Sequence, residues 1–299
     1  MPTRAASHPF ATVRDLFRYA VSRFNRAHLA FGHGNANAYD EAAYLILHTL
    51  SLPLDTLDPW LDAVLLDEEI DAVLAIIERR VDERIPAAYL TREAWMHGQR
   101  FYVDERVIVP RSFIGELLVN GLEPWISDPE AVGSVLELCT GSACLAILAA
   151  QAFPNAEIDA VDLSEDALDV AERNVNDYRL SERIALFAGD LYAPLPERRY
   201  DLIFSNPPYV NSASMAALPL EYRREPEMAL AGGADGMDIV RRIIESARDY
   251  LTDDGLLVVE IGNEREHAEA AFGGLDPVWL STSAGDDAVF LIHAGDLPD

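Results

Sequence analysis

The second half of the chain alternates short apolar segments with helix-like segments, and no other feature limits the possible folds as much. From Ser134 onward, runs that favour β-structure are separated by stretches whose apolar residues recur at helical spacing. This alternation is typical of a mostly parallel α/β sheet with helices packed against it. The expected strands are residues 135–138, 158–161, 184–187, 202–205, 256–261 and 289–293, and the expected helices include 144–152 and 238–251.

The first part of the chain has a different pattern. Apolar residues recur at helical spacing in three stretches up to residue 81, and Pro53 and Pro59 separate two of them. Short β-favouring segments follow, divided by polar turns such as His97-Gly98. These segments are residues 88–90, 94–96, 101–103 and 107–109. We therefore expect a helical N-terminal domain over 1–84, a β-hairpin linker over 85–111 and an α/β domain over 112–299, which begins with a helix near 114–119.

The turn after the first expected strand has the residues of a nucleoside site. It reads Glu137-Leu138-Cys139-Thr140-Gly141-Ser142. Ligands of such sheets bind outside the carboxyl ends of the strands, and a glycine there lets the backbone approach the ligand closely. Asp162 ends the second strand, where a carboxylate can accept both ribose hydroxyls. An ordinary strand-to-helix turn with a solvated Asp162 is the alternative at this point.

The same turn disfavours a dinucleotide. The segment after Gly141 lacks the second and third glycines of the pattern that cradles a pyrophosphate. A further carboxylate, Asp190, follows the third strand and is placed to meet an adenine amino group. Acids after three successive strands therefore predict a site for an adenosine without phosphates, and the neighbouring Leu163 and Leu191 are included in it.

The fourth strand ends in Asn206-Pro207-Pro208-Tyr209, which indicates the reaction. Prolines are stiff and donate no backbone hydrogen bond, but their carbonyls and the Asn206 side-chain oxygen can accept. A planar amide or exocyclic amine is a poor nucleophile, because its lone pair is delocalised. Accepting both of its N–H bonds turns the lone pair toward a methyl group on an activated sulfonium, so that proximity does most of the work. Tyr209 can stack on the planar group. These four residues are the predicted catalytic residues.

Composition excludes several other classes of site. The two cysteines, Cys139 and Cys144, have no CxxC spacing and the seven histidines form no cluster, so we expect no metal site and no disulfide framework. The net charge is −28, and every one of the 23 basic residues is arginine, which argues against an extensive nucleic-acid surface and suits a basic protein partner. Residues 1–10 lack the apolar run of a secretory signal, and no segment has the apolar length of a membrane span, so we expect a cytoplasmic protein with no membrane partner.

Taken together, these motifs resemble those of the class I methyltransferases that modify planar nitrogens. Within that group the chain resembles the HemK/PrmB family of protein glutamine N5-methyltransferases along nearly its whole length. Further matching segments are Pro110-Arg111 before the core, residues 224–230 after the tetrapeptide, Gly233 and Asp235-Gly236. The resemblance implies a class I, Rossmann-like methyltransferase sheet over residues 112–299, with a small N-terminal helical domain that helps to recognise the substrate.

The resemblance also implies the cofactor, the substrate and the roles of individual residues. The cofactor would be S-adenosyl-L-methionine, the product S-adenosyl-L-homocysteine, and the reaction N5-methylation of a glutamine side-chain amide. Segments 31–34, 109–117, 221–223 and 287–290 resemble the branch that acts on large-subunit ribosomal protein three. The implied cofactor residues are Glu137, Cys139, Thr140, Gly141, Ser142, Asp162, Leu163, Asp190, Leu191 and Asn206, and the implied substrate-binding residues are Arg111, Asn206, Pro207, Tyr209 and Glu225.

One position departs from the family pattern. The loop of the family reads Gly-Ser-Gly, and Ala143 stands at its third position here. The added methyl group crowds the methionine part of the cofactor or favours the helix that starts there, and we expect weakened cofactor binding at worst.

Three other functions fit parts of the pattern. Methylation of a release-factor glutamine differs from the favoured reaction only in its protein substrate. Methylation of adenine or guanine in nucleic acid uses a similar tetrapeptide but needs a basic groove, which a charge of −28 disfavours. An assembly factor that has lost catalysis would keep the fold, but the intact Asn206 and Asp162 argue against it.

Overall fold

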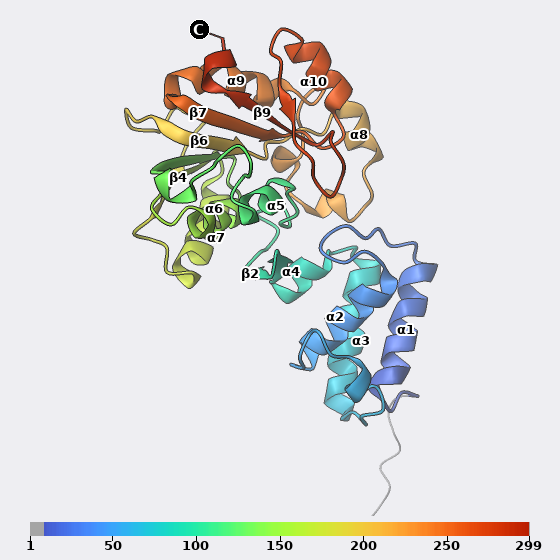
Figure 1. Ribbon diagram of the computed structural model, residues 1–299. Helices are drawn as coiled ribbons and strands as arrows, with labels where there is room; N and C mark the ends of the chain where they lie inside the picture. Colours follow the sequence, from blue (N-terminus) through green and yellow to red (C-terminus); the bar gives the residue numbers. More distant parts are fainter. Residues whose placement is uncertain (1–8, 299) are drawn as a thin grey trace, which may run out of the picture. The chain divides into compact units, whose positions relative to one another are not determined.

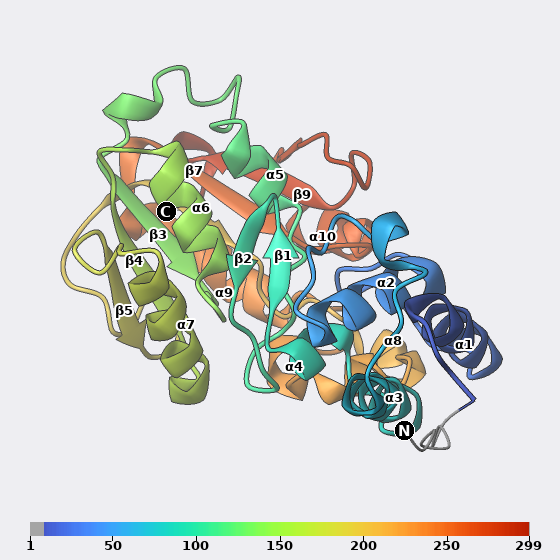
Figure 2. The same cartoon turned by 90° about the horizontal axis from the view of Figure 1, so that it is seen from below.

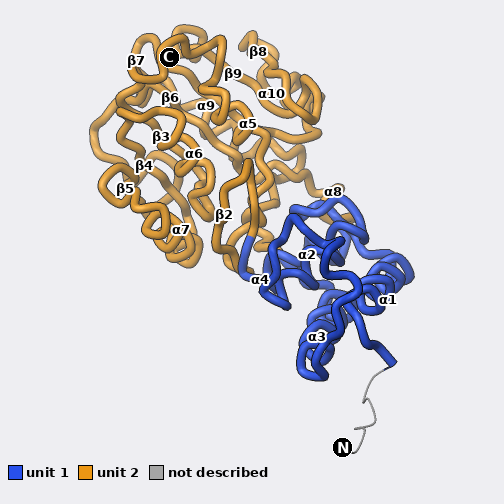
Figure 3. The backbone as a smooth tube through the Cα atoms, turned by 60° about the horizontal axis from the view of Figure 1, so that its bottom comes forward, with its two compact units in different colours: residues 1–93, 219–224 blue, residues 94–218, 225–299 orange. Residues whose placement is uncertain are grey.

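The computed structural model describes residues 9–298, so most of the segment in which we expect no secretory signal lies outside the described residues. Contacts divide the chain into two compact units (Figure 3). One, here called the helical unit, consists of Met1–Glu93 with Pro219–Arg224, and the other, the sheet unit, of Ala94–Leu218 with Glu225–Asp299. Residues 85–93 of the predicted linker thus group with the helices and 94–111 with the sheet. The division into three functional domains stays a prediction.

The helical unit is built from the three helices that the periodicity predicts, and a short fourth one follows. Side chains cap the first two: Thr12 and Asp15 form a reciprocal capping box, and Asn37 accepts hydrogen bonds from the next helix's first turn. The apolar stripes of these helices pack together in one buried cluster, which explains why the amphipathic segments fold as a bundle. The helices are α1 (Val13–Arg26), α2 (Ala38–Thr49), α3 (Asp67–Asp82) and α4 (Ala87–Thr91), with a 3₁₀ turn η1 (Asp58–Trp60) between α2 and α3.

The prediction of β-structure at residues 88–90 is wrong, because these residues lie in α4. Pro86 precedes the helix, and its carbonyl accepts the N–H groups of Tyr89 and Leu90 at 3.0 and 3.2 Å. The fixed φ of proline suits a helix start. Arg92 then ends the helix in the left-handed conformation, with φ of 57°. A local turn-forming signal therefore outweighed the β-favouring composition of three residues.

A buried ionic cluster joins the segment Pro219–Arg224 to the helices of its unit. Arg80 on α3 is fully buried, and its Nε atom donates to Glu41 on α2 at 2.6 Å. Its other nitrogens donate to the Ala30 carbonyl at 3.0 Å and to Glu221 at 3.5 Å, and Glu221 also accepts from Arg84 at 3.1 Å. Burial raises the pKa of Glu41, and Arg80 offsets part of that rise. The two carboxylates therefore depend on arginine to remain charged inside the unit.

The sheet unit contains a seven-stranded sheet in the order β5-β4-β3-β6-β7-β9-β8 (Figure 1). The strands β3 to β7 run parallel to one another, and β9 pairs antiparallel with both β7 and β8. Every strand expected for the α/β domain is present, which confirms the α/β class, and β8 is an additional short one. The strands are β3 (Ser134–Leu138), β4 (Glu157–Asp162), β5 (Ile184–Ala188), β6 (Tyr200–Ser205), β7 (Leu251–Glu260), β8 (Val278–Trp279) and β9 (Val289–His293).

Helices cover both faces of this sheet (Figure 2). Alternate residues of β3 illustrate this: Val135 packs in a cluster with α5, α6 and α7, whereas Leu136 packs in a second cluster with α9 and α10. Because successive side chains of a strand point to opposite faces, strands that are apolar throughout require cover on both sides. The helices of the sheet unit are α5 (Ile114–Val119), α6 (Cys144–Ala152), α7 (Glu165–Asp177), α8 (Ser212–Ala217), α9 (Asp238–Tyr250) and α10 (Arg265–Phe272). Its 3₁₀ turns are η2 (Pro129–Ala131), η4 (Glu227–Ala229) and η5 (Ala294–Asp296), whereas η3 (Tyr222–Arg224) belongs to the helical unit.

The predicted hairpin is present but shorter than expected. Its strands are β1 (Ala94–Met96) and β2 (Gln99–Phe101), which pair antiparallel. The strands predicted beyond Phe101 are absent, since their backbone groups find side-chain partners elsewhere. Asn174 on α7 accepts from the Tyr102 N–H at 2.8 Å and donates to its carbonyl at 3.0 Å. The N–H of Val109 donates to the Glu225 side chain at 2.9 Å.

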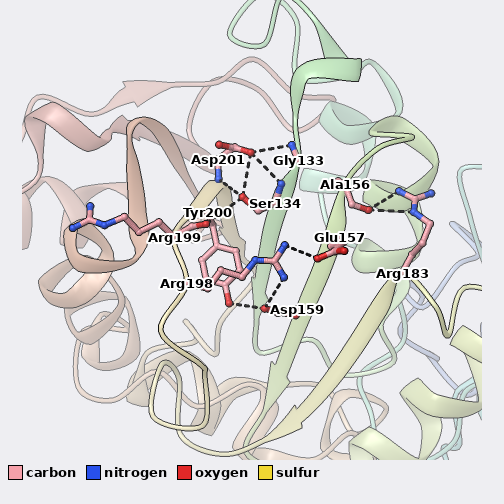
Figure 4. Close-up of polar contacts among 10 residues, drawn as sticks. All are labelled: Gly133, Ser134, Ala156, Glu157, Asp159, Arg183, Arg198, Arg199, Tyr200 and Asp201. Atoms are coloured by element: carbon pink, nitrogen blue, oxygen red, sulfur yellow. Dashed lines mark hydrogen bonds and ion pairs between the residues drawn. The ribbon is translucent and has the colours of Figure 1, made fainter.

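Polar side chains hold the amino-terminal edge of the sheet together (Figure 4). Asp201 accepts hydrogen bonds from the backbone of Gly133 and Ser134, which aligns the start of β6 with that of β3. Buried Asp159 accepts from the Tyr200 hydroxyl at 2.6 Å, and Arg198 lies beside both. Arg183 donates to carbonyls near the end of α6. These contacts stabilise the amino-terminal ends of the strands. The carboxyl ends, on the opposite side of the sheet, remain available for ligands. No helix within residues 9–298 is long and apolar enough to cross a membrane.

The ionic cluster gives a prediction for stability. Replacing Arg80 with Met should lower the free energy of unfolding by about 3–5 kcal/mol, because buried Glu41 loses its counter-charge and Glu221 keeps only Arg84. The matched control is Arg79→Met on the same helix, whose partner Glu83 is about half exposed, and it should cost no more than about 1 kcal/mol. Urea unfolding followed by circular dichroism measures both. Equal stability of the two variants would contradict a dependence of the helical unit on this cluster.

Candidate active site

The candidate site lies where the order of the parallel strands reverses. The central strand β3 pairs with β4 on one side and β6 on the other, so the connections after β3 and β6 leave the sheet in different directions. In register, Leu138 is opposite Ser205, and the Ser205 hydroxyl donates to the Leu138 carbonyl at 2.8 Å. This places Cys139 and Asn206 side by side at the carboxyl edge. The space between two such neighbouring loops is the usual ligand site of an open α/β sheet.

Glu137 holds the loop after β3 through two hydrogen bonds. Its carboxylate is buried and accepts from the Thr140 hydroxyl at 2.6 Å and from the Ala146 N–H at 2.9 Å. Burial raises the pKa of Glu137 to about 8, although both hydrogen bonds lower it. Glu137 therefore shapes the loop and the start of α6. Its predicted direct role in cofactor binding stays a prediction.

The loop itself has an unusual backbone. Cys139, Gly141 and Ala143 all have positive φ, between 56° and 61°. At Gly141 a side chain would meet open space, so the ligand side of the loop is uncovered there. Ala143 is fully buried in the core cluster, and the left-handed conformation it adopts is the one that favours glycine. Its methyl group is therefore directed into the core, and Ala143 is not among the residues that line the cavity described below.

Asp162 ties the loop to the end of β4. One carboxylate oxygen accepts from the Gly141 N–H at 2.8 Å and the other from the Ser164 N–H at 2.9 Å. Burial raises the pKa of Asp162, and these backbone hydrogen bonds reduce that rise. Each carboxylate oxygen can accept more than one hydrogen bond. Asp162 can therefore hold the loop and still accept the two hydroxyls of a ribose.

A cavity of about 170 Å³ opens between these loops. Its lining contains the predicted residues Cys139, Gly141, Asp162, Leu163, Asp190, Leu191, Asn206 and Pro208. Glu137, Thr140 and Ser142 are buried behind the loop, and Pro207, Tyr209, Arg111 and Glu225 are outside the lining. The structure thus brings together the residues after β3, β4, β5 and β6, as four neighbouring parallel strands require.

Part of the lining was not predicted. Arg106, Val107 and Ile108 precede the sheet, Pro226, Met228, Ala229 and Ala231 follow the tetrapeptide, and Ile239 lies on α9. Most of these are apolar and suit the faces of a planar ring. The sequence signal for them was weak, because short apolar runs in loops are indistinguishable from core segments until the chain is folded. Met228 and Leu163 are both more than half exposed, which leaves apolar surface beside the cavity.

Asp190 reaches the lining with a partner of its own. Its carboxylate accepts from Arg242 on α9 at 2.7 Å, and both side chains are about half exposed. An exposed ion pair of this kind is worth little and exchanges readily with other partners. Asp190 therefore remains able to accept from an amino group inside the cavity.

Asn206 contributes a polar side chain to the cavity. It lines the cavity, and among the described residues its side chain makes no hydrogen bond. The two prolines after it keep the chain stiff, and Pro207 is buried. Both atoms of the Asn206 amide are thus available to a ligand a short distance from Asp162.

The two thiols near the cavity have raised pKa values. Burial raises the pKa of Cys139 and of Cys144 to about 12, and neighbouring carboxylates contribute to both rises. A thiol that stays protonated is a poor nucleophile and a poor metal ligand. Within residues 9–298, no group of three or more His, Cys, Asp or Glu side chains is arranged to hold a metal ion.

Arg111 and Glu225 form a bidentate pair next to the tetrapeptide loop. The Glu225 carboxylate is fully buried and accepts from both terminal nitrogens of Arg111, one of them at 2.7 Å. It also accepts from the Val109 N–H at 2.9 Å. Such a fork fixes the guanidinium plane as well as its charge. Glu225 therefore orients Arg111, whose side chain is about one quarter exposed.

Comparison with known proteins agrees with this geometry. Residues 115–218 match the family model described as the methyltransferase small domain. The chain is 74% identical over 297 residues to the ribosomal protein uL3 glutamine methyltransferase of Burkholderia pseudomallei, and the match covers 97% of both chains. It is 62% identical over 281 residues to the protein of that name from Bordetella pertussis, covering 94% of each. For the one from Neisseria gonorrhoeae, the identity is 58% over 287 residues, covering 96% of each.

Identities of this level along nearly the whole chain confirm the resemblance found from the motifs. The first of these matches covers 97% of both chains, so it includes both units. The chain belongs to the family of ribosomal protein uL3 glutamine methyltransferases.

Proposed function

We propose that this protein transfers a methyl group from S-adenosyl-L-methionine to the side-chain nitrogen of a glutamine in large-subunit ribosomal protein uL3, releasing S-adenosyl-L-homocysteine and a proton. The observation that carries the proposal is the position of the Asn206 amide, which is unengaged and lines the same cavity as Asp162. The names of relatives up to 74% identical support the substrate.

The residues of the cavity suit this cofactor. Asp162 can accept the ribose hydroxyls, and Asp190 the adenine amino group, while the apolar lining suits the faces of the base. The loop Cys139–Ser142 presents backbone groups to the methionine portion. When bound, the cofactor supplies a methyl group already activated by a sulfonium. We accordingly assign Glu137, Thr140 and Ser142 to shaping this loop and Leu163 and Leu191 to the walls.

The chain's own residues act on the glutamine amide. The Asn206 side-chain oxygen and the carbonyls of the adjacent prolines accept its two N–H bonds, which fixes the nitrogen and weakens the delocalisation of its lone pair. Tyr209 packs against the amide plane. Both groups orient the nitrogen for in-line attack, and orientation of this kind accounts for much of the acceleration when no strong base is needed.

We further propose that Arg111, held by Glu225, contacts the polypeptide around the glutamine, and that the helical unit recognises the rest of the protein. A net charge of −28 favours encounter with a basic ribosomal protein and disfavours a nucleic-acid substrate. A ribosomal protein is met in the cytoplasm, which we propose as the site of action.

The experiment that tests the function uses ribosomal proteins and release factors from cells that lack this gene. They are incubated with the enzyme and labelled S-adenosyl-L-methionine and then analysed by mass spectrometry. A single methyl group on a glutamine of uL3 is the expected result. A methyl group on a release-factor glutamine would move the substrate to the other branch, and label in nucleic acid alone would overturn the proposal.

The role of Asn206 gives a second prediction. Asn206→Ala should lower kcat by at least about 10²-fold, because the amide loses the acceptor that orients it. The affinity for S-adenosyl-L-homocysteine, measured by calorimetry, should stay within about twofold. Asn155→Ala is the control: this asparagine lies in the exposed turn before β4, donates to the Glu130 carbonyl and should leave kcat unchanged. Near-full turnover of Asn206→Ala would refute the mechanism.

Asp162 gives a third prediction. Asp162→Ala should weaken binding of S-adenosyl-L-homocysteine about 10- to 100-fold, since hydrogen bonds to a charged group are worth roughly 1.5–3 kcal/mol. The control is Asp177→Ala at the end of α7, whose side chain is more than half exposed and pairs with Arg173, outside the cavity lining. Calorimetric titration of the two variants decides the matter, and an unchanged dissociation constant for Asp162→Ala would remove this residue from the cofactor site.

A further inference from the structure

A buried carboxylate that the mechanism above does not use lies behind the tetrapeptide. Glu260 ends β7 and is about 1% exposed. One of its oxygens accepts from the Ser112 hydroxyl at 2.5 Å and from the Phe113 N–H at 2.8 Å. The other oxygen faces the Tyr209 hydroxyl at 3.4 Å. A single side chain thus connects the end of β7 to the start of α5, directly after Arg111, and to the last residue of the tetrapeptide.

Three glycines, here together called the seat of Tyr209, leave room for this residue. A Cβ atom at Gly262, two residues after Glu260, would lie 2.6 Å from the Tyr209 ring. A Cβ atom at Gly232 would lie 2.7 Å from the Tyr209 Cα atom, and one at Gly236 would lie 2.2 Å from its carbonyl oxygen. All three distances are too short for a side chain, so these positions need glycine to admit Tyr209. The backbone beside it is also fixed, because Val210 exchanges hydrogen bonds with Leu230 and Gly232.

The chemistry of Glu260 suits a holding role. Burial raises the pKa of Glu260 to about 7, and the hydrogen bonds from Ser112, the backbone and Tyr209 limit the rise. Burial and the nearby carboxylates raise the pKa of the Tyr209 hydroxyl above its usual value, so it remains a donor. A donor hydroxyl aimed at a buried acceptor, with glycine packed on the ring, leaves the ring few orientations.

We propose that Glu260 is a positioning residue for the transfer: it holds the Tyr209 ring from behind, so that the ring presents a fixed face to the glutamine amide beside Asn206. The reaction in which it acts is the one proposed above, but the holding of the ring is independent of it. Glu260 touches neither the cavity nor the reacting atoms and acts through Tyr209.

The first test observes the ring directly. Protein labelled with ¹³C-tyrosine, with the Tyr209 signals assigned by their loss in Tyr209→Phe, is compared with Glu260→Met, which keeps the bulk and removes both acceptors. We expect the Tyr209 ring signals to shift or broaden in Glu260→Met and to stay in place in Glu260→Gln, whose amide can still bond both Ser112 and Tyr209. Unchanged ring signals in Glu260→Met would overturn the proposal, whatever the substrate of the enzyme.

The second test is kinetic. Glu260→Met should lower kcat by about 10- to 100-fold while the dissociation constant of S-adenosyl-L-homocysteine stays within about twofold, and Glu260→Gln should restore kcat to within about threefold of the wild type. Tyr209→Phe should add little to the loss in the Glu260→Met background, because the two residues act as one unit. Multiplicative losses, or a kcat of Glu260→Met equal to that of the wild type, would refute the coupling.

If Glu260→Met fails to fold, a third variant still tests whether the Tyr209 ring is held in place. Gly262→Ala places a methyl group against the Tyr209 ring without touching Glu260, and it should perturb the ring signals and lower kcat. Gly98→Ala is its control, since Gly98 also has positive φ, at 77°, but a Cβ atom there meets nothing within 4 Å. Equal ring signals and equal kcat in the two alanine variants would contradict a tight seat for the ring. If the wild-type enzyme transfers no methyl group to uL3, this result would count against the proposed function and not against the role of Glu260.

Discussion

The parallel pairing of β3 with β6 is the constraint on which the site depends. It sets Leu138 opposite Ser205, so the loop that begins at Cys139 and the tetrapeptide that begins at Asn206 leave the sheet as neighbours. A slip of one residue would turn every side chain of β6 to the other face and separate the two loops. The amino-terminal edge resists such a slip, because Asp201 accepts hydrogen bonds from the first residues of β3. A structural cluster at one edge thus maintains the register that forms the crevice at the other.

Three carboxylates at the carboxyl edge share one physical role, and two of them, Glu137 and Glu260, are buried. Asp162 and Glu260 end parallel strands and Glu137 is the last residue but one of another, and each accepts a hydrogen bond from a backbone N–H group outside its own strand. Burying a carboxylate costs free energy unless its oxygens accept hydrogen bonds. Each carboxylate therefore depends on the segment that donates to it, and that segment is held in place by the carboxylate. Asp162 retains capacity for a ligand at the cavity, whereas Glu137 and Glu260 are enclosed. Asp162 therefore remains open to the cavity, whereas Glu137 and Glu260 only position the segments beside them.

The segment between the tetrapeptide and α9 serves both units. Pro219–Arg224 belongs to the helical unit, where Glu221 joins the buried arginines, and Glu225 immediately after it orients Arg111 in the sheet unit. Residues 230–236 then pack around Tyr209 and Val210, which explains why this stretch is so rich in glycine. A contiguous piece of sequence therefore belongs to the helical unit at its start and shapes the loop of Tyr209 a few residues later.

Local pattern alone determined much of this protein. Apolar alternation located six of the seven strands of the main sheet and the principal helices, because strands buried on both faces and amphipathic helices leave clear signatures. The acids after β3, β4 and β5 and the Asn206 tetrapeptide were also found in this way, since their chemistry is local and their strand ends share one edge. The same reasoning failed at residues 88–90 and 107–109, where three or four residues carry too little periodicity to outweigh a proline-initiated turn or a side-chain partner.

Only the tertiary structure decided which of those residues face the cavity and which stand behind it. Glu137 and Asp162 look alike in the sequence, and their difference comes from the loop that folds over one of them. The pairing of Arg111 with Glu225, the seat of Tyr209 and the apolar walls from residues 106–108 and 226–231 join positions more than a hundred residues apart or loops without periodicity. Such contacts depend on which distant segments the fold brings together, and the packing of the whole sheet determines this.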